Sequence, residues 1–167
     1  GEFVGRWSSL DAVTCEISSK AAGKVSFNNC SFWGPINRCI LMNAPNGQLT
    51  ANVCNFVSWD VQNNGAPAIQ LDAGKAIIQG NTFESGRNHI KIGPKVKSAI
   101  VMGNQTADDM KIDNAIGNKL ISIGNTMNTI KFTDAAKMSY KVFVGSEGDI
   151  KYLDGWSARE PAREWTP

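Results

Sequence analysis

The eight residues Val25-Ser-Phe-Asn-Asn-Cys-Ser-Phe32 return at four further places along the chain without a gap. The later copies are Leu49-Thr-Ala-Asn-Val-Cys-Asn-Phe56, Ala76-Ile-Ile-Gln-Gly-Asn-Thr-Phe83, Ala99-Ile-Val-Met-Gly-Asn-Gln-Thr106 and Leu120-Ile-Ser-Ile-Gly-Asn-Thr-Met127. Their starts lie 24, 27, 23 and 21 residues apart. A unit of this length cannot bury its apolar side alone, so it stacks on its neighbours at about 4.8 Å. The repeat therefore predicts an all-β fold, a parallel β-helix.

A second set of strand-like segments falls between these copies. They are Ile40-Leu-Met42, Ile69-Gln-Leu71, Ile90-Lys-Ile92, Met110-Lys-Ile112 and Ile130-Lys-Phe132. The last four alternate apolar, polar and apolar residues, which is the period of a strand with one buried face. We expect about five to six coils.

Polar residues in the repeat predict a corner and an internal column. Val25 and Phe27 are at odd positions and Cys30 and Phe32 at even ones, so in a straight strand the two pairs would face opposite sides. A bend at residues 28–29 would return both pairs to the interior. Asparagine tolerates the left-handed backbone of such a corner. The sixth position of the repeat then forms one stacked column, in which we expect the asparagine amides to hydrogen-bond from coil to coil. Its members are Cys30, Cys54, Asn81, Asn104 and Asn125.

The four cysteines follow the same spacing. Cys15 and Cys39 are 24 residues apart, as are Cys30 and Cys54, so each pair is expected one coil apart in one column. Two interpretations remain open: stacks of small buried hydrophobic residues, or two disulfides. No CxxC pair is present, so we expect no zinc site and no other metal or cofactor.

Composition limits the class of protein. The chain has 167 residues, a net charge of +2 and 42% hydrophobic residues, which fits one ordered domain and disfavours nucleic-acid and membrane partners. Residues 1–3 are typical of a cloning scar and are set aside from the fold. We expect the β-helix over 4–139. Residues 140–167 should form a capping strand with a tail, or the start of a further domain.

The repeat resembles the last coils of pectate-lyase-like proteins. The resemblance rests on Val25-Ser-Phe-Asn-Asn-Cys-Ser-Phe-Trp-Gly-Pro35, Val53-Cys-Asn-Phe-Val-Ser-Trp-Asp60 and Ile78-Gln-Gly-Asn-Thr-Phe83, and it covers residues 10–132. It implies a right-handed parallel β-helix, a secreted or cell-surface bacterial protein, and a polysaccharide partner. The catalytic motifs of that superfamily do not carry over: Asn88-His89-Ile90-Lys91 resembles the histidine element of polygalacturonases, but Asp108-Asp109 lies on the wrong side of it.

Two tryptophans are the main candidates for sugar contacts. Trp33 and Trp59 follow aligned phenylalanines on consecutive coils, and exposed indole faces stack on pyranose rings. Hydroxyl groups would then be bound by Arg38, Asp60, Glu84 and Arg87. The competing interpretation is that one or both indoles close the hydrophobic interior.

Charged residues elsewhere have plainer explanations. His89 is expected to be a surface or packed histidine rather than a general base. Lys91, Lys111 and Lys131 would form a basic ladder if they stack in register. Such a ladder is usually a solvated face, and otherwise attracts acidic polysaccharide.

The sequence therefore favours a non-catalytic carbohydrate-binding module for a plant cell-wall polysaccharide such as xylan or pectin, joined to a catalytic domain of the same parent chain. The alternative is the C-terminal portion of a polysaccharide lyase or glycoside hydrolase whose catalytic coils lie upstream. A third class is an adhesive β-helix that trimerises.

Overall fold

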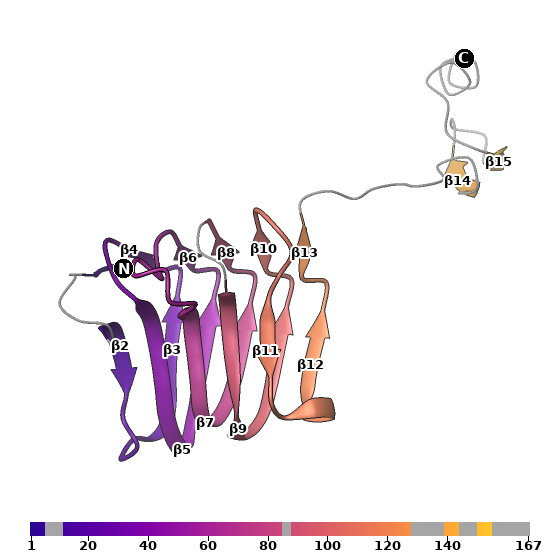
Figure 1. Ribbon diagram of the computed structural model, residues 1–167. Coiled ribbons are helices and arrows are strands. Elements are labelled where there is room, and N and C mark those ends of the chain that lie inside the picture. Colours follow the sequence, from indigo (N-terminus) through magenta and orange to yellow (C-terminus); the bar gives the residue numbers. More distant parts are fainter. Residues whose placement is uncertain (6–11, 85–87, 128–138, 144–149, 155–167) are drawn as a thin grey trace. The chain divides into compact units, whose positions relative to one another are not determined.

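A computed structural model describes residues 1–5, 12–84, 88–127, 139–143 and 150–154. The chain divides into two compact units, residues 1–129 and residues 130–167. The first unit contains the repeat, and its strands wind into a right-handed parallel β-helix (Figure 1).

One sheet of the first unit is made of short strands. Its six strands are β1 (Glu2–Val4), β4 (Ser31–Trp33), β6 (Asn55–Phe56), β8 (Thr82–Phe83), β10 (Gln105–Thr106) and β13 (Thr126–Met127), which pair in that order. All of these pairs are parallel.

The other sheet contains the long strands. Its members are β2 (Val13–Ile17), β3 (Ala22–Asn28), β5 (Arg38–Asn52), β7 (Pro67–Gln79), β9 (Asn88–Met102), β11 (Ile112–Asn114) and β12 (Leu120–Ile123). β5, β7 and β9 each bend in the middle and supply two sides of a coil. In the coil before β5, two separate strands, β2 and β3, take the place of one long bent strand. In the coil after β9, β11 and β12 do the same, and the short 3-10 helix η1 (Gly117–Lys119) lies between them in sequence.

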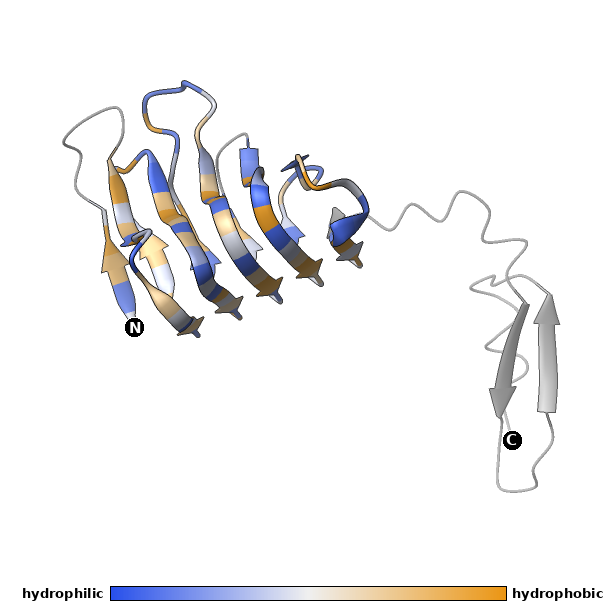
Figure 2. Cartoon of the chain, turned by 90° about the horizontal axis from the view of Figure 1, so that it is seen from below, coloured by the Kyte–Doolittle hydropathy of each residue, from blue (hydrophilic) through white to orange (hydrophobic). Residues whose placement is uncertain are grey.

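The observed register confirms the gapless repeat. Val25 pairs with Leu49, Leu49 with Ala76, Ala76 with Ala99, and Ala99 with Leu120. Residues about two dozen apart are therefore vertical neighbours, as the period predicts. Hydropathy alternates along the strands because successive side chains point into and out of the coil (Figure 2).

The second column is confirmed only in its first part. Ile40 pairs with Ile69 and Ile69 with Ile90, but the partner of Ile90 is Ile112 instead of Met110. The prediction of a basic ladder is therefore wrong. Lys91 lies beside Asp113, and the backbone of Lys111 bonds to His89. Lys131 lies outside the described residues.

Four phenylalanines stack through the interior of the coils. The ring centroids of Phe3, Phe32, Phe56 and Phe83 follow one another at 4.8, 4.9 and 4.8 Å, with interplanar angles of 8–11°. This spacing is that of the strands themselves, so each ring continues the register of its backbone. Phe3 belongs to this stack and β1 pairs with β4, so the expectation that residues 1–3 lie outside the fold is wrong.

The predicted asparagine column exists. Asn81 donates from Nδ2 to Oδ1 of Asn104 at 2.9 Å, and Asn104 donates likewise to Asn125 at 2.8 Å. Each amide also bonds to backbone of an adjoining coil, for example Asn81 Oδ1 with the amide N–H of Cys54 at 2.8 Å. The ladder thus supplies partners for polar groups inside an otherwise apolar coil.

The corner before this column is left-handed, as expected. Asn29, Val53, Gly80, Gly103 and Gly124 all have φ between 50° and 62°. Glycine and asparagine adopt this conformation readily, whereas a β-branched side chain does so at a cost. Val53 is therefore the strained member of the column.

The cysteines are free thiols in the structure. Cys30 and Cys54 share a column, since the adjoining Ser31 pairs with Asn55. Cys15 pairs with Ile40, so the prediction that Cys15 and Cys39 share one is wrong. Burial, and secondarily the charge of Cys15, raise the pKa of Cys39 to about 12, which keeps that thiol neutral.

The second unit contains β14 (Ser139–Phe143) and β15 (Ile150–Asp154), which pair antiparallel. A strand is expected within residues 140–167, and β14 is present there with β15 as its partner.

Candidate functional site

A polar groove lies on the outer side of the long-stranded sheet. It has a volume of about 480 Å³ and receives residues from β5, β7, β9 and β11 and from the loop before β7. Its polar side chains are Arg38, Asn64, Gln70, Asn88, Lys91 and Asp113. This volume falls within the range of about 300–1,000 Å³ that is usual for small-molecule sites.

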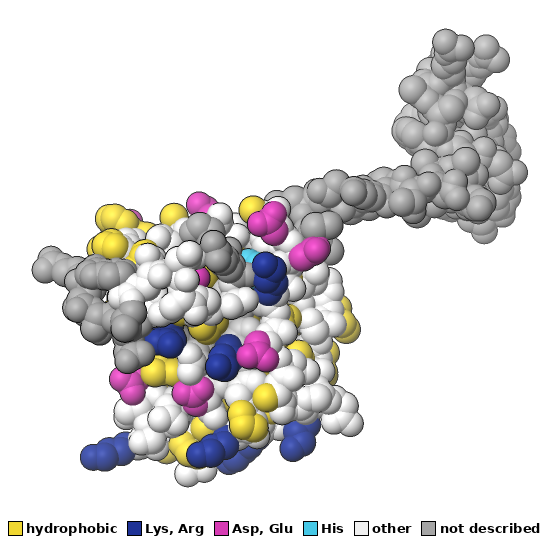
Figure 3. Space-filling view, viewed as in Figure 1, with side chains coloured by type: hydrophobic (Ala, Val, Ile, Leu, Met, Phe, Trp, Pro, Cys, Tyr) yellow, Lys and Arg dark blue, Asp and Glu magenta, His cyan; other side chains and the backbone are white. Residues whose placement is uncertain are grey.

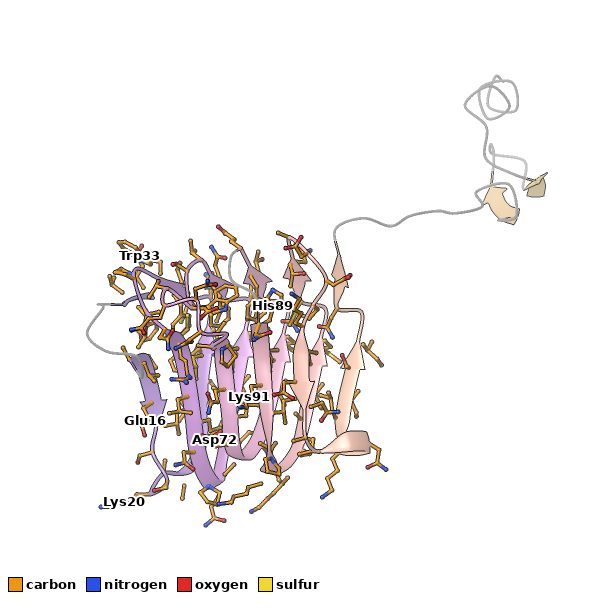
Figure 4. The ribbon with its side chains drawn as sticks, viewed as in Figure 1. Glu16, Lys20, Trp33, Asp72, His89 and Lys91 are labelled. Atoms are coloured by element: carbon orange, nitrogen blue, oxygen red, sulfur yellow. The ribbon has the colours of Figure 1, made fainter. Side chains whose placement is uncertain are left out.

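The floor of the groove is an outward-facing column of the sheet. Gln70 pairs with Lys91, and Lys91 pairs with Asp113, so three consecutive coils contribute one residue each to the floor. Lys91 and Asp72 lie on the same outer face in Figure 4. Gln70 donates from Nε2 to the Asp72 carboxylate at 2.9 and 3.2 Å, which holds this amide in place.

One wall of the groove is the loop over residues 57–66, and Asp60 shapes it. Asp60 is buried, with φ of 51°, and its Oδ1 accepts hydrogen bonds from the backbone N–H groups of Asn64, Gly65 and Ala66 at 2.9, 3.0 and 3.1 Å. Three donors on one carboxylate oxygen fix the turn that presents Asn64 to the groove. Asp60 therefore has a structural role in this loop, and its contact with sugar hydroxyls stays a prediction.

Trp59 lies behind the groove. Its side chain is only 3% exposed, and its rings pack edge-on against Phe83 at 6.0 Å and His89 at 5.8 Å. The indole Nε1 donates to the carbonyl oxygen of Asn88 at 2.8 Å. The prediction of an exposed sugar platform is thus wrong for Trp59, because the loop turns the indole inward to complete the core.

His89 is a packed histidine, which confirms the structural interpretation. It is buried against Phe83, and its Nδ1 accepts the backbone N–H of Lys111 at 3.0 Å. Burial lowers the pKa of His89, the positive charge of Lys111 lowers it further, and Asp108 partly opposes the shift. A neutral ring with Nδ1 as acceptor joins β9 to the segment before β11.

Trp33 and Glu84 lie on the other sheet. Trp33 is 43% exposed in β4 and pairs with the half-exposed Val4 of β1. Figure 4 labels it at the upper left of the view, near the first short strands. Glu84 is exposed after β8 and accepts a hydrogen bond from Asn55 Nδ2 at 2.8 Å. Backbone bonds from Val57 to Phe32 and from Glu84 to Phe56 place Trp33, Val57 and Glu84 at successive positions of one outward column.

The structure therefore separates the predicted site residues. Arg38 lies in the groove, Trp59 and Asp60 lie behind it, and Trp33 and Glu84 lie on the outer face of the short-stranded sheet. Arg87 lies outside the described residues.

Sequence reasoning missed most groove residues. Asn64, Gln70 and Asp113 carry no motif, and Asn88 drew notice only through its neighbour His89. These four residues lie in or shortly before strands of the long-stranded sheet. A search for polar residues at equivalent positions of successive coils would have found Gln70 beside Lys91. It would have missed Asp113, because the expected register was two residues off.

Two further features were sought in the described part of the chain. No group of three or more metal-ligating side chains occurs there. Among the same residues, no helix has the length and apolarity needed to cross a membrane.

Comparisons with known proteins give no assignment. No protein-family model, curated protein or solved structure matches the chain.

Proposed function

We propose that this protein is a non-catalytic polysaccharide-binding module and that the groove over β5, β7, β9 and β11 holds a stretch of an acidic plant cell-wall polysaccharide, such as pectin. The single observation that supports this most strongly is the set of polar side chains gathered in one concavity from four successive strands of the sheet.

The chemistry of the groove suits a sugar acid. Asn64, Gln70 and Asn88 carry amides, which offer both donors and acceptors to hydroxyl groups. Arg38 and Lys91 supply two positive charges, and a guanidinium can bind a carboxylate through two parallel hydrogen bonds. A uronic acid combines these features, because it has several hydroxyls and one carboxylate on each ring.

The shape of the groove suits a polymer. Its floor repeats at the strand spacing of about 4.8 Å, and about the same length is needed for one pyranose unit. A chain crossing the strands would therefore pass one outward polar side chain of each coil in turn, those of Gln70, Lys91 and Asp113. This geometry favours an extended saccharide over a compact metabolite.

Binding is favoured over catalysis by the charges in the groove. Glycoside hydrolysis by the usual mechanism needs two carboxyl groups flanking the bond. Among the described residues that line the groove, Asp113 is the one carboxylate, and it lies beside Lys91 in the sheet. The single carboxylate supports binding over cleavage. From the sequence resemblance we propose further that the module is of pectate-lyase-like type, is secreted and assists a catalytic domain.

Trp33 remains a second proposed contact. Its indole is exposed on the short-stranded sheet and offers a face on which a pyranose ring can stack. The groove and Trp33 lie on different sheets, so a variant of each separates their contributions.

Affinity electrophoresis through gels containing polygalacturonate, xylan or a neutral β-glucan tests the proposal. Lys91 is exposed, so Lys91→Gln should fold normally and should weaken retardation by polygalacturonate. Lys20→Gln removes the same charge from an exposed turn outside the groove and is the matched control. Equal retardation of wild type and Lys91→Gln, or no retardation in any gel, would overturn the assignment.

A further inference from the structure

A second concavity lies at the edge where the long strands bend. It has a volume of about 370 Å³, and three lysines line it: Lys24, Lys75 and Lys97. Each lysine comes from a different coil, in β3, β7 and β9. In Figure 3, Lys and Arg side chains (dark blue) gather along the lower edge of the first unit, where the long strands bend.

The register sets the spacing of the lysines. Lys24 pairs with Gln48, and Gln48 pairs with Lys75, so Lys24 and Lys75 lie two strands apart, or about 10 Å between backbones. Lys75 pairs with Ser98, which adjoins Lys97 on the next coil. The Lys97 Nζ lies 3.5 Å from Oδ1 of Asn46 in the turn of β5. All three lysines therefore line the same concavity as the turn residues 45–48, and Lys97 contacts that turn directly.

The charge of this concavity is uncompensated by its own lining. The described residues around it include three lysines and no aspartate or glutamate. Lysines on the outermost strand of a sheet commonly prevent edge-to-edge aggregation, but Lys75 belongs to β7, which is paired on both sides by β5 and β9. Edge protection therefore does not account for it.

The turns beneath the lysines are closely packed. Gly74 has φ of 90°, and a Cβ at this position would lie 2.4 Å from the carbonyl oxygen of Ala44. A Cβ on Gly47 would lie 2.8 Å from the Cβ of Ala44. This close backbone packing favours a concavity whose backbone is already formed before a ligand binds, which reduces the ordering cost of binding.

We propose that this turn-edge concavity is a second binding site, specific for the clustered anionic groups of a sulfated polysaccharide. A lysine ammonium is a compact charge with three rotatable donors, so it responds to the charge density of a ligand more than to the planar shape of a carboxylate. The site goes beyond the groove, whose described lining has one arginine, one lysine and one aspartate among amides.

The test compares two triple variants with the same change of charge. Lys24→Gln/Lys75→Gln/Lys97→Gln removes the site, and Lys20→Gln/Lys95→Gln/Lys119→Gln removes three exposed lysines outside it. The probe is a heparin oligosaccharide, titrated by calorimetry at about 50 and about 200 mM NaCl. Circular dichroism checks that both variants fold.

We expect the site variant to lose about tenfold or more in affinity at low salt, with the slope of log K against log salt falling by about two to three. The control variant should stay within about twofold of wild type. Lys91→Gln should retain heparin binding, so failure of the groove proposal is distinguishable from failure of this one.

Three outcomes would overturn the inference. One is no heparin binding by wild type. Another is equal loss in the two triple variants, which would mean diffuse attraction. The third is equally tight binding of a DNA duplex, which would mean selection of charge alone and not of a polysaccharide.

Discussion

The indole nitrogen of Trp59 donates a hydrogen bond to the carbonyl oxygen of Asn88, 29 residues later, across 2.8 Å. Through this bond a buried ring of one coil fixes a groove residue of the next. Asn88 in turn donates from Nδ2 to the carbonyl oxygen of Gly65 at 2.7 Å, which ties the strand to the loop that forms the wall. The shape of the groove thus depends on a residue that does not line it.

Replacing Trp59 with phenylalanine should therefore weaken the groove and the fold together. The variant loses the donor for Asn88 and part of a buried ring, so the free energy of unfolding should fall by about 2 kcal/mol. Affinity for polygalacturonate should fall as well. Urea denaturation measures the first effect and calorimetry the second.

Trp33→Phe is the control for this comparison. Because Trp33 is 43% exposed, its replacement should change stability by less than about 0.5 kcal/mol. A larger loss of stability in Trp33→Phe than in Trp59→Phe would contradict the positions of the two indoles.

Asn104 carries the asparagine ladder and should be intolerant of truncation. Its Oδ1 accepts from the backbone N–H and the Nδ2 of Asn81 at 3.0 and 2.9 Å, and its own Nδ2 donates to Ile78 and Asn125. Asn104→Ala leaves these groups unpaired inside the coil and should cost about 3 kcal/mol of unfolding free energy. Gln105→Ala, at the exposed next position, should cost little. Similar unfolding midpoints for both variants would refute the ladder's role.

Replacing Val53 should have the opposite effect and increase the stability of the fold. Its φ is 51°, and its side chain is 58% exposed, so the strain is not compensated by burial. Val53→Asn should raise the free energy of unfolding by about 1 kcal/mol, because asparagine adopts the left-handed conformation more easily. Thermal unfolding measures this. A lowered melting temperature would show that the valine side chain contributes contacts that outweigh its strain.

His89 should make stability depend on pH. Its folded pKa is lowered, mainly by burial, so below the ordinary value of 6.5 the unfolded chain binds a proton that the folded chain does not. The free energy of unfolding should be constant above that pH and should decline as pH falls from 6.5 toward the folded pKa. His89→Asn keeps a side-chain acceptor and should remove this decline. Denaturation curves at several pH values for both proteins decide the matter, and identical pH profiles would exclude His89 as the cause.

The periodic part of the fold was predictable from sequence because each copy of the repeat is buried in the same way. The column from Cys30 to Asn125 was identified correctly, since a buried amide has few other solutions in a stacked coil. The register of Met110 was predicted incorrectly, because the alternation of apolar and polar residues fits two registers that differ by two residues. The structure has the register that gives the Nδ1 of His89 a backbone partner at Lys111.

The site was less predictable because loops without periodicity build it. Nothing in the sequence pattern indicates that Asp60 would gather three backbone N–H groups. That turn directs Trp59 inward and places Asn64 in the lining of the groove, to which Arg38 also belongs. Of the described residues predicted to contact sugar, Arg38 alone lines this concavity, and its role in binding stays a prediction.

The groove is tested most directly by two-dimensional NMR of the ¹⁵N-labelled protein during titration with trigalacturonate. The backbone amide signals of residues 64–66 and 88–91 should shift progressively and saturate together, because these residues surround the bound saccharide. The same titration of Lys91→Gln should need more ligand to reach saturation. Shifts centred on Trp33 and Glu84, or no shifts at any ligand concentration, would contradict the proposal that the groove binds an acidic polysaccharide.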